Sequence, residues 1–460
     1  MVDWSPEMKP WHTPAALTWL QFIMQERFGL SFSLKPHADY RGITLHLTGE
    51  ARGITIAHDG ATFTRADSNL ACSSWNAAAE GWHTALDPVL PAPGVSRLSS
   101  PLVVPTPQGY HIQYDILGLT FWMLTRQEEV GRTDLDDHSR FPATASHAYK
   151  HGYLERPIVD EWLHILGQVI ARTWPGIELK KHQFRMKVSH DVDGPSRYAF
   201  RTTCGMLRAM AGDVMKRGDF KSALLAPWVR MNSNIALHPA DPANTFDWIM
   251  EISERHGLIS AFYFICGRTD SSKDADYEPE HPAIRDLMRR IHARGHEIGL
   301  HPSYGSYQLP LIIKEEADRL RRIAAEEGIV QSDWGGRMHY LRWEQPTTLR
   351  AWLNAGMTYD STMGYADRPG FRCGTCFEYP AFDPVLGEAL NLRVRPLIAM
   401  ECTVMAQRYM GLGNGQAALD KFKQLKKVCQ LLGGVFTLLW HNSNFEVTQE
   451  QLLYQQILDN

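Results

Sequence analysis

The chain has few cysteines, and those few are scattered. Its 460 residues include seven, and only Cys373 and Cys376 stand at a spacing that suits a metal or redox pair. A structural zinc site of that kind needs a second pair, which the sequence does not have. We therefore expect reduced thiols, as in a cytosolic protein, and no disulfide framework.

Long apolar runs and a strong charge of one sign are also missing. No stretch approaches the roughly 18 consecutive apolar residues of a membrane span, and residues 1–7 lack the basic start and apolar run of a secretory signal. The net charge is −4 and the pI about 6.6, which does not favour nucleic acid as a partner. These absences predict a cytoplasmic protein without a membrane span, and leave peripheral membrane attachment and the oligomeric state open.

The first 180 residues predict a small α+β domain. A helix begins at Thr13-Pro14, short strands follow near 43–47 and 54–57, and helices are indicated near 115–129 and 157–172. The chain is 44% hydrophobic, enough to bury about two or three domain cores. This half contains no catalytic motif that we can name.

From Phe184 onward, apolar strands alternate with amphipathic helices. Strands are predicted at 184–190, 261–266, 296–301, 337–343 and 435–441, and helices near 244–257, 282–295, 313–328, 349–354 and 418–433. Such an alternation predicts an α/β fold with a parallel sheet or barrel over 181–460. Residues 197–240 interrupt the pattern and indicate a helical insertion, which could cover a site.

Two carboxylates end the first of these strands. Asp191 and Asp193 stand two residues apart, and Gly194-Pro195 stops the strand directly after them. Strand periodicity places both acids on one side of the sheet, at the end where parallel sheets carry their chemistry. One acid can hold a metal while the other takes a proton from water, although the same residues also favour a plain turn.

Histidines end two further strands. His301 closes strand 296–301, and alternation turns it away from His296, which begins that strand and is the structural candidate. His441 ends the last predicted strand. A single histidine is more often structural than catalytic, but a barrel gathers several polar strand ends at one mouth.

The short motifs of residues 180–445, taken in their order along the chain, resemble those of the polysaccharide deacetylases of carbohydrate esterase family 4, the NodB homology domain. That family has a distorted (β/α) barrel and uses a divalent metal to remove acetyl groups from N-acetylated sugars. Its first motif, Thr-Phe-Asp-Asp-Gly, is similar to Ser189–Gly194, with one extra residue between the acids. The resemblance implies that Asp191 is the catalytic base and Asp193 a metal ligand.

The second and third motifs depart from the family pattern. His301 matches the first histidine of His-Ser/Thr-x-x-His, but the second histidine falls on Gly305. Arg337 matches the arginine of Arg-x-Pro-Tyr, which implies that it orients the catalytic carboxylate. His339 stands where that motif has proline, and we suggest that it supplies the missing third ligand.

The remaining site residues also come from the resemblance, except Tyr304, which is near the predicted mouth and could stack on a sugar ring, although packing explains such an aromatic equally well. The Leu-x-His motif matches residues 439–441, which implies that His441 is the general acid. Asp360 stands where a fourth motif is expected. Asp360, Tyr304 and Tyr340 are the candidate substrate-binding residues. Residues 115–129 resemble part of an uncharacterised domain that precedes some bacterial deacetylase-like proteins, which adds no mechanism.

These residues predict a metal-dependent hydrolase that deacetylates an N-acetylated sugar or glycan precursor. Nitrogen and carboxylate ligands suit zinc best, while cobalt, nickel and iron also fit. Two alternatives stay open at this point. The same barrel could hydrolyse a small non-sugar amide, or it could be a degenerate, non-catalytic glycan-binding protein, because Gly305 breaks the usual ligand set.

Overall fold

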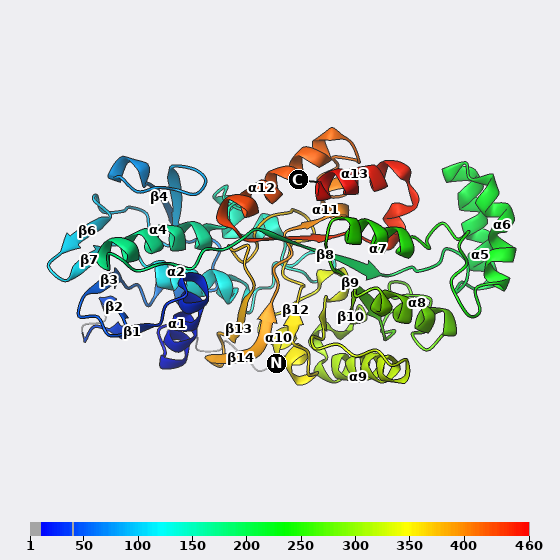
Figure 1. Ribbon diagram of the computed structural model, residues 1–460, viewed down its shortest axis with the longest axis horizontal. Helices are drawn as coiled ribbons and strands as arrows, with labels where there is room; N and C mark the ends of the chain where they lie inside the picture. The colour runs from blue at the N-terminus through cyan, green and yellow to red at the C-terminus, as the bar shows by residue number, and fades with distance from the viewer. Residues whose placement is uncertain (1–10, 39–40, 460) are drawn as a thin grey trace.

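The computed structural model describes residues 11–38 and 41–459, and a nine-stranded sheet lies at its centre (Figure 1). The strand order is β13-β14-β12-β11-β10-β9-β8-β16-β15. All neighbours are parallel except β13 and β14. The strands are β8 (Arg185–Val192), β9 (Ser260–Ile265), β10 (Glu297–His301), β11 (Gly335–Gly336), β12 (Tyr359–Asp360), β13 (Tyr379–Asp383), β14 (Glu388–Val394), β15 (Ala399–Met400) and β16 (Val435–Leu439).

The predicted alternation of strands and helices is confirmed. Helix α12 packs on β16, α8 and α9 pack on β10, and α10 packs on β14. The helices of this part are α7 (Phe246–Arg255), α8 (Pro282–Ala293), α9 (Pro310–Glu326), α10 (Thr347–Asn354), α11 (Glu401–Met405), α12 (Gln416–Leu432) and α13 (Thr448–Leu458).

The sheet is open within the described ranges, so the predicted barrel is not confirmed. Its end strands, β13 and β15, pair only with β14 and β16. Helix α1 (Pro14–Phe28) packs on β13 and β14, and the Trp19 indole donates to the Pro380 carbonyl at 2.9 Å. Pro380 also has no N–H to offer a further strand. The N-terminal helix therefore occupies the edge that barrel closure would use.

The strand predicted at 337–343 is wrong. Only Gly335 and Gly336 pair as a strand, and a turn follows in which Tyr340 and Leu341 have φ of 60° and 56°. Left-handed residues cannot continue a strand. A Cβ on Gly336 would collide with the Leu300 carbonyl, so the contact between β10 and β11 requires glycine at that position.

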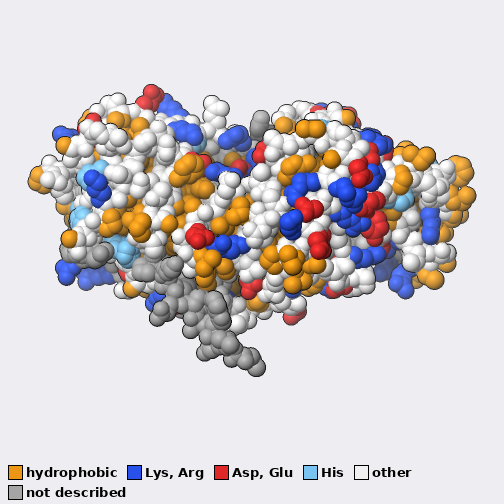
Figure 2. Space-filling model, turned by 90° about the horizontal axis from the view of Figure 1, so that it is seen from below, with side chains coloured by type: hydrophobic (Ala, Val, Ile, Leu, Met, Phe, Trp, Pro, Cys, Tyr) orange, Lys and Arg blue, Asp and Glu red, His pale blue; other side chains and the backbone are white. Residues whose placement is uncertain are grey.

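The insertion after β8 is helical, as predicted. It comprises α5 (Thr203–Gly212), a π-helical turn at Asp213–Arg217 and α6 (Phe220–Met231). It forms one end of the elongated molecule (Figure 1), where apolar side chains gather on the surface (Figure 2). None of its described residues lines the pocket at the C-terminal ends of β8, β10 and β16, so the predicted cover over the site is not seen.

The N-terminal half contains the predicted α+β elements. A five-stranded sheet has the order β1-β2-β3-β7-β6, and β4 pairs with β5. Its elements are β1 (Phe32–Pro36), β2 (Gly42–Leu47), β3 (Gly53–Ala57), β4 (Cys72–Asn76), β5 (Val89–Pro93), β6 (Val103–Thr106), β7 (Gly109–Ile112), α2 (Ile116–Leu124), α3 (His147–Lys150) and α4 (Ile158–Thr173).

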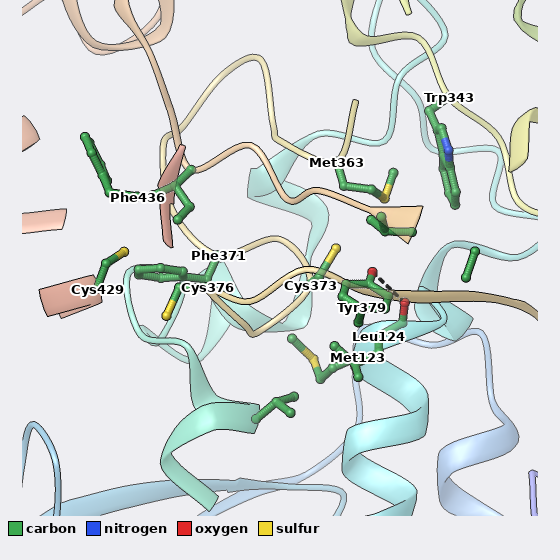
Figure 3. Packing of buried hydrophobic residues seen from close by; sticks show 14 of the residues in the cluster. Met123, Leu124, Trp343, Met363, Phe371, Cys373, Cys376, Tyr379, Cys429 and Phe436 are labelled. Carbon is green, nitrogen blue, oxygen red and sulfur yellow. Dashed lines mark hydrogen bonds between the residues drawn. The ribbon is translucent and has the colours of Figure 1, made fainter. Parts of the chain in front are cut away.

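One hydrophobic core runs through both halves. In Figure 3, Met123 and Leu124 of α2 lie beside Cys373 and Tyr379, and the Tyr379 hydroxyl donates to the Leu124 carbonyl at 2.8 Å. All seven cysteines are free. The domain boundary predicted near residue 180 therefore separates two sequence patterns but not two cores, and it stays a prediction. No helix of the described chain has both the length and the apolar character of a membrane span.

Candidate active site and metal centre

A pocket of about 230 Å³ lies at the C-terminal ends of β8, β10 and β16. Six of the nine predicted site residues line it, namely Asp191, Asp193, His301, His339, Tyr340 and His441. The structure thus gathers at one mouth side chains that are up to 250 positions apart in the sequence, as expected for the ends of parallel strands.

Asp193, His301 and His339 form a candidate metal-binding group. His301 Nε2 lies 3.4 Å from Asp193 Oδ1, and His339 Nε2 lies 3.8 Å from the same oxygen. Ligands at about 2.0–2.2 Å from a tetrahedral ion are roughly 3.3–3.6 Å apart. The His301–Asp193 distance falls in this range and the His339–Asp193 distance is slightly longer, so the three side chains lie close enough to share one small ion after a small adjustment.

Both histidines are oriented so that Nε2 faces Asp193. His301 Nδ1 lies 2.6 Å from the Arg337 carbonyl, and His339 Nδ1 lies 3.2 Å from Asp274 Oδ1. A carbonyl or carboxylate oxygen only accepts, so each Nδ1 carries a hydrogen and Nε2 is the nitrogen that can bind an ion when it is deprotonated. A hydrogen bond on the far nitrogen is the usual support for a metal-binding histidine.

Two buried atoms of this group have no hydrogen-bond partner in the described chain, namely Asp193 Oδ1 and His301 Nε2. Buried polar atoms are rarely left unpaired, and an ion between these two would satisfy both. Burial lowers the pKa of His339, but the charges of Asp193 and Asp274 outweigh burial and raise it to about 9. The two carboxylates thus attract positive charge at this point, and the donor set fits a divalent metal.

Asp191 is fixed beside the metal group by Arg337. The guanidinium is 1% exposed and donates to Asp191 Oδ1 at 2.7 Å. It also donates to Ser189 Oγ at 2.8 Å and to the carbonyl and hydroxyl of Ser361 at 3.1 Å. Asp191 Oδ2 is left facing His301 Nε2 at 3.6 Å. One carboxylate oxygen is therefore anchored, and the other borders the proposed ion position.

His441 and Glu401 form a pair on the opposite side of Asp193. His441 Nδ1 contacts Glu401 Oε1, which also accepts from the Asn444 side chain at 2.8 Å. His441 Nε2 lies 3.6 Å from Asp193 Oδ2. Burial lowers the pKa of His441, but the charge of Glu401 and the hydrogen bonds that the ring makes to Cys402 and Glu401 raise it well above its ordinary value.

The three predicted substrate residues have different positions. Tyr340 lines the pocket. Tyr304 lies behind Tyr340, with ring centroids 5.1 Å apart, and its hydroxyl is 3.0 Å from His138 Nδ1. Asp360 is fully buried, and its Oδ1 accepts from the amide and hydroxyl of Thr362. Asp360 therefore anchors the turn after β12 and does not line the pocket, and its role in substrate binding stays a prediction.

The sequence analysis missed three residues that shape this site. Asp274 lies in an irregular loop, and Glu401 follows the two-residue strand β15. Arg140 comes from the N-terminal half and donates to the Tyr340 carbonyl at 2.9 Å, which holds the left-handed turn in place. Only Glu401 left a signal, because it ends the apolar run 397–400 as Asp191 ends its own strand.

Comparisons with known proteins give weak similarities. Residues 10–175 match the model of a family of unknown function, DUF7033, and the search of curated proteins found no match. The chain is similar to the structure of a candidate polysaccharide deacetylase from Mycobacterium smegmatis at 16% identity and a TM-score of 0.37, over 62% of this chain and 84% of that one.

Two other solved structures score in the same range. Puue allantoinase has 14% identity and a TM-score of 0.35, with 62% and 84% covered. A probable polysaccharide deacetylase from Pseudomonas aeruginosa PAO1 has 14% identity and a TM-score of 0.34, with 62% and 85% covered. Scores this low carry no argument about what the chain does.

Proposed function

We propose that the protein is a metal-dependent hydrolase that removes the acetyl group from an N-acetylated sugar or glycan precursor. The observation that carries this proposal is the arrangement around Asp193. Two histidine Nε2 atoms face its buried oxygen, and an arginine-anchored carboxylate lies beside them. Metal ligands, a base and a positioned acid are the parts that metal-assisted amide hydrolysis requires.

Asp193, His301 and His339 would hold the ion, and zinc suits two nitrogens and one carboxylate oxygen. When bound, a divalent ion supplies an acidified water and polarises the acyl oxygen. His339 thus takes the place of the family histidine that falls on Gly305. The Gly305 amide donates to Thr269 Oγ1 at 2.7 Å, and this residue has no side chain to offer the site.

Asp191 acts as the general base in this proposal. Its Oδ2 faces the ligand group, while Arg337 holds Oδ1 and prevents the carboxylate from rotating. Oδ2 is therefore the oxygen that accepts the proton of the attacking water. General base help of this kind contributes about 10²–10⁴-fold.

His441 acts as the general acid. Because Glu401 accepts the Nδ1 hydrogen, Nε2 is left for the pocket, and the raised pKa of His441 favours the protonated ring that a general acid needs. A leaving amine is too basic to depart without a proton, so the ring donates Nε2–H to it as the C–N bond breaks. Glu401 then steadies the ring and is a positioning residue.

The pocket dimensions favour a single sugar unit as substrate. Its volume of about 230 Å³ is below the ~300–1,000 Å³ of pockets that enclose drug-sized ligands. Tyr340 and Tyr409 line it together with Arg140 and Arg408. Ring faces and polar tips of this kind suit a hydroxyl-rich ring. The cytoplasmic location stays a prediction.

Acetate release tests the proposal. Protein stripped with a chelator and reloaded with zinc is given N-acetylglucosamine oligomers, UDP-N-acetylglucosamine and small cyclic amides. We expect acetate from a sugar substrate only with metal. D191N should lose at least about 100-fold in kcat/KM with unchanged zinc affinity. D333N, an exposed aspartate before β11, is the matched control and should match the wild type.

The outcomes separate the three readings of the sequence. If the protein hydrolyses a cyclic amide but releases no acetate from any sugar, the proposed active site is right and its substrate is a small non-sugar amide. Zinc binding with sugar binding but no turnover would leave a glycan-binding protein. Full activity in D191N would show that the base is another residue.

A further inference from the structure

The helical insertion exposes an unusual amount of apolar surface. Eight of the nineteen large apolar side chains that are exposed in the described chain lie between residues 207 and 235. The most exposed are Met215, Leu224 and Ile235, at 83%, 82% and 75%. Figure 2 shows hydrophobic side chains gathered at the insertion end of the molecule, with basic side chains among them. Large exposed apolar patches mark surfaces that contact something else.

The helical hairpin has one face turned inward and one outward. Its helices α5 and α6 pack together through a small core that includes Met206 and Val229. Phe220, Leu224 and Trp228 follow at four-residue spacing and are all exposed, so they share the outer face of α6. Aromatic side chains with aliphatic neighbours are the composition of a membrane-interface face.

Basic side chains also line a hollow on the α5 side of the hairpin, where the exposed Met215 lies as well. A cavity of about 480 Å³ is bordered by four basic residues, Arg201, Arg208, Lys216 and Arg217, and by the ion pair of Arg197 and Glu446. Asp213 is fully buried and pairs with Arg217, whereas Arg201, Arg208 and Lys216 form no ion pair with any described residue. Seven basic and two acidic residues lie in 197–240, a net +5 (7 − 2) in a chain of net −4.

We propose that this hairpin docks the protein on the surface of an anionic lipid bilayer. The outer face of α6 lies in the interface, and the basic hollow takes lipid phosphates. Lys and Arg near an anionic surface each add to binding, and apolar area sets its strength. The inference does not depend on the proposed hydrolysis, because it uses no residue of the catalytic pocket.

Charge favours a bilayer over a second copy of the chain. Two hairpins facing each other would bring together the unpaired Arg201, Arg208 and Lys216 of both copies. The acids on the hairpin do not offset them, because Asp213 is buried and Asp219 already lies 4.0 Å from Arg197. Like charges in an apolar contact oppose association, whereas an anionic surface complements them.

Vesicle sedimentation with the full chain tests the proposal. We expect the wild type to sediment with vesicles of equal phosphatidylglycerol and phosphatidylcholine, and at least about tenfold less with phosphatidylcholine alone. Binding should weaken as salt rises from 0.05 to 0.5 M, since screening shortens the reach of surface charge. No binding to the anionic vesicles at low salt would overturn the proposal.

Matched pairs of variants test the surface itself. L224S with W228S should lower the partition coefficient at least about tenfold, because both side chains leave the interface. L311S with V330S changes two side chains that are 75% and 82% exposed elsewhere and should bind as the wild type does. K216E with K221E should lose binding, and K423E with K427E on α12 should keep it.

Two further results would contradict the proposal. Equal binding by L224S/W228S and the wild type would show that α6 does not contact lipid. If sedimentation velocity shows a wild-type dimer that L224S/W228S converts to a monomer, the face is a self-association surface. Circular dichroism of each variant confirms that lost binding is not lost folding.

Discussion

Asp274 offers a sharp test of the metal centre, because it touches a proposed ligand but not the ion. Its side chain is fully buried. Oδ1 accepts from His339 Nδ1 at 3.2 Å and from the Tyr304 amide at 2.7 Å. Oδ2 accepts from the amides of Thr269 and Asp270, both at 2.8 Å. In each of these hydrogen bonds a carboxylate oxygen of Asp274 is the acceptor.

The variant D274N keeps the size of the side chain and removes one acceptor. In either orientation of the new side-chain amide, its NH₂ group faces N–H donors that previously donated to the carboxylate, so those donors lose their acceptor. If it faces His339, the imidazole loses the support that holds Nε2 toward Asp193. Losing such a partner typically costs 10–100-fold in metal affinity, or about 1.4–2.7 kcal/mol.

Competitive zinc titration of the stripped protein against a chromophoric chelator measures this cost. We expect the zinc Kd of D274N to rise about 10–100-fold. D276N changes an exposed aspartate that pairs with Arg268 and should stay within about twofold of the wild type. An unchanged Kd in a folded D274N would refute the reasoning, because His339 would then not be held as a ligand through Asp274.

Three other predictions test different parts of the account. R337K should lose about 100-fold in kcat/KM at unchanged zinc Kd, because an ammonium cannot hold the Asp191 carboxylate in one orientation. Burial raises the pKa of Glu316 from 4.5 to about 7, so its stabilising contribution is complete below pH 4.5 and is lost as pH rises through 7. Urea unfolding at pH 5 and at pH 8 measures this: the free energy of unfolding should fall by about 2–3 kcal/mol less in E316Q than in the wild type between these two pH values. E315Q, which changes the neighbouring exposed glutamate, is the control and should behave as the wild type does. D160N should lower the free energy of unfolding by about 3–5 kcal/mol in one calorimetric transition, because the buried carboxylate pairs with Arg27 of its own half and accepts two hydrogen bonds, from Thr375 and Cys376, of the other half.

Each of these has its own contrary result. R337K with normal turnover would remove the arginine from the orienting role. Parallel pH profiles of E316Q and the wild type would show that the carboxyl does not titrate in this range. Two separate transitions in D160N or the wild type would show that the halves unfold independently, despite their continuous core.

The sequence was informative wherever regular strands carried the chemistry. Period-two alternation on β8 placed Asp191 and Asp193 on one side, and the same rule selected His301 over His296. The structure turns His301 into the pocket. His296 lies at the other end of β10, where its Nδ1 accepts from the Ser260 amide.

Segments of irregular backbone could not be predicted from the sequence. The run 337–343 has strand-like composition, but the pairing ends at Gly336, and Tyr340 and Leu341 are left-handed, which no strand can continue. The turn that follows is held by Arg140, some 200 positions away. No local pattern encodes such a long-range contact, and for the same reason the position of Asp274 beside His339 could not be predicted.

The most direct test of the central claim is anomalous diffraction at the zinc absorption edge, from crystals of the zinc-loaded protein. The account predicts one strong peak bonded to Asp193, His301 and His339 at about 2.0–2.2 Å, with Asp191 next to it but not a ligand. A peak that lacks His339, or a zinc-loaded crystal with no peak beside Asp193, would contradict it.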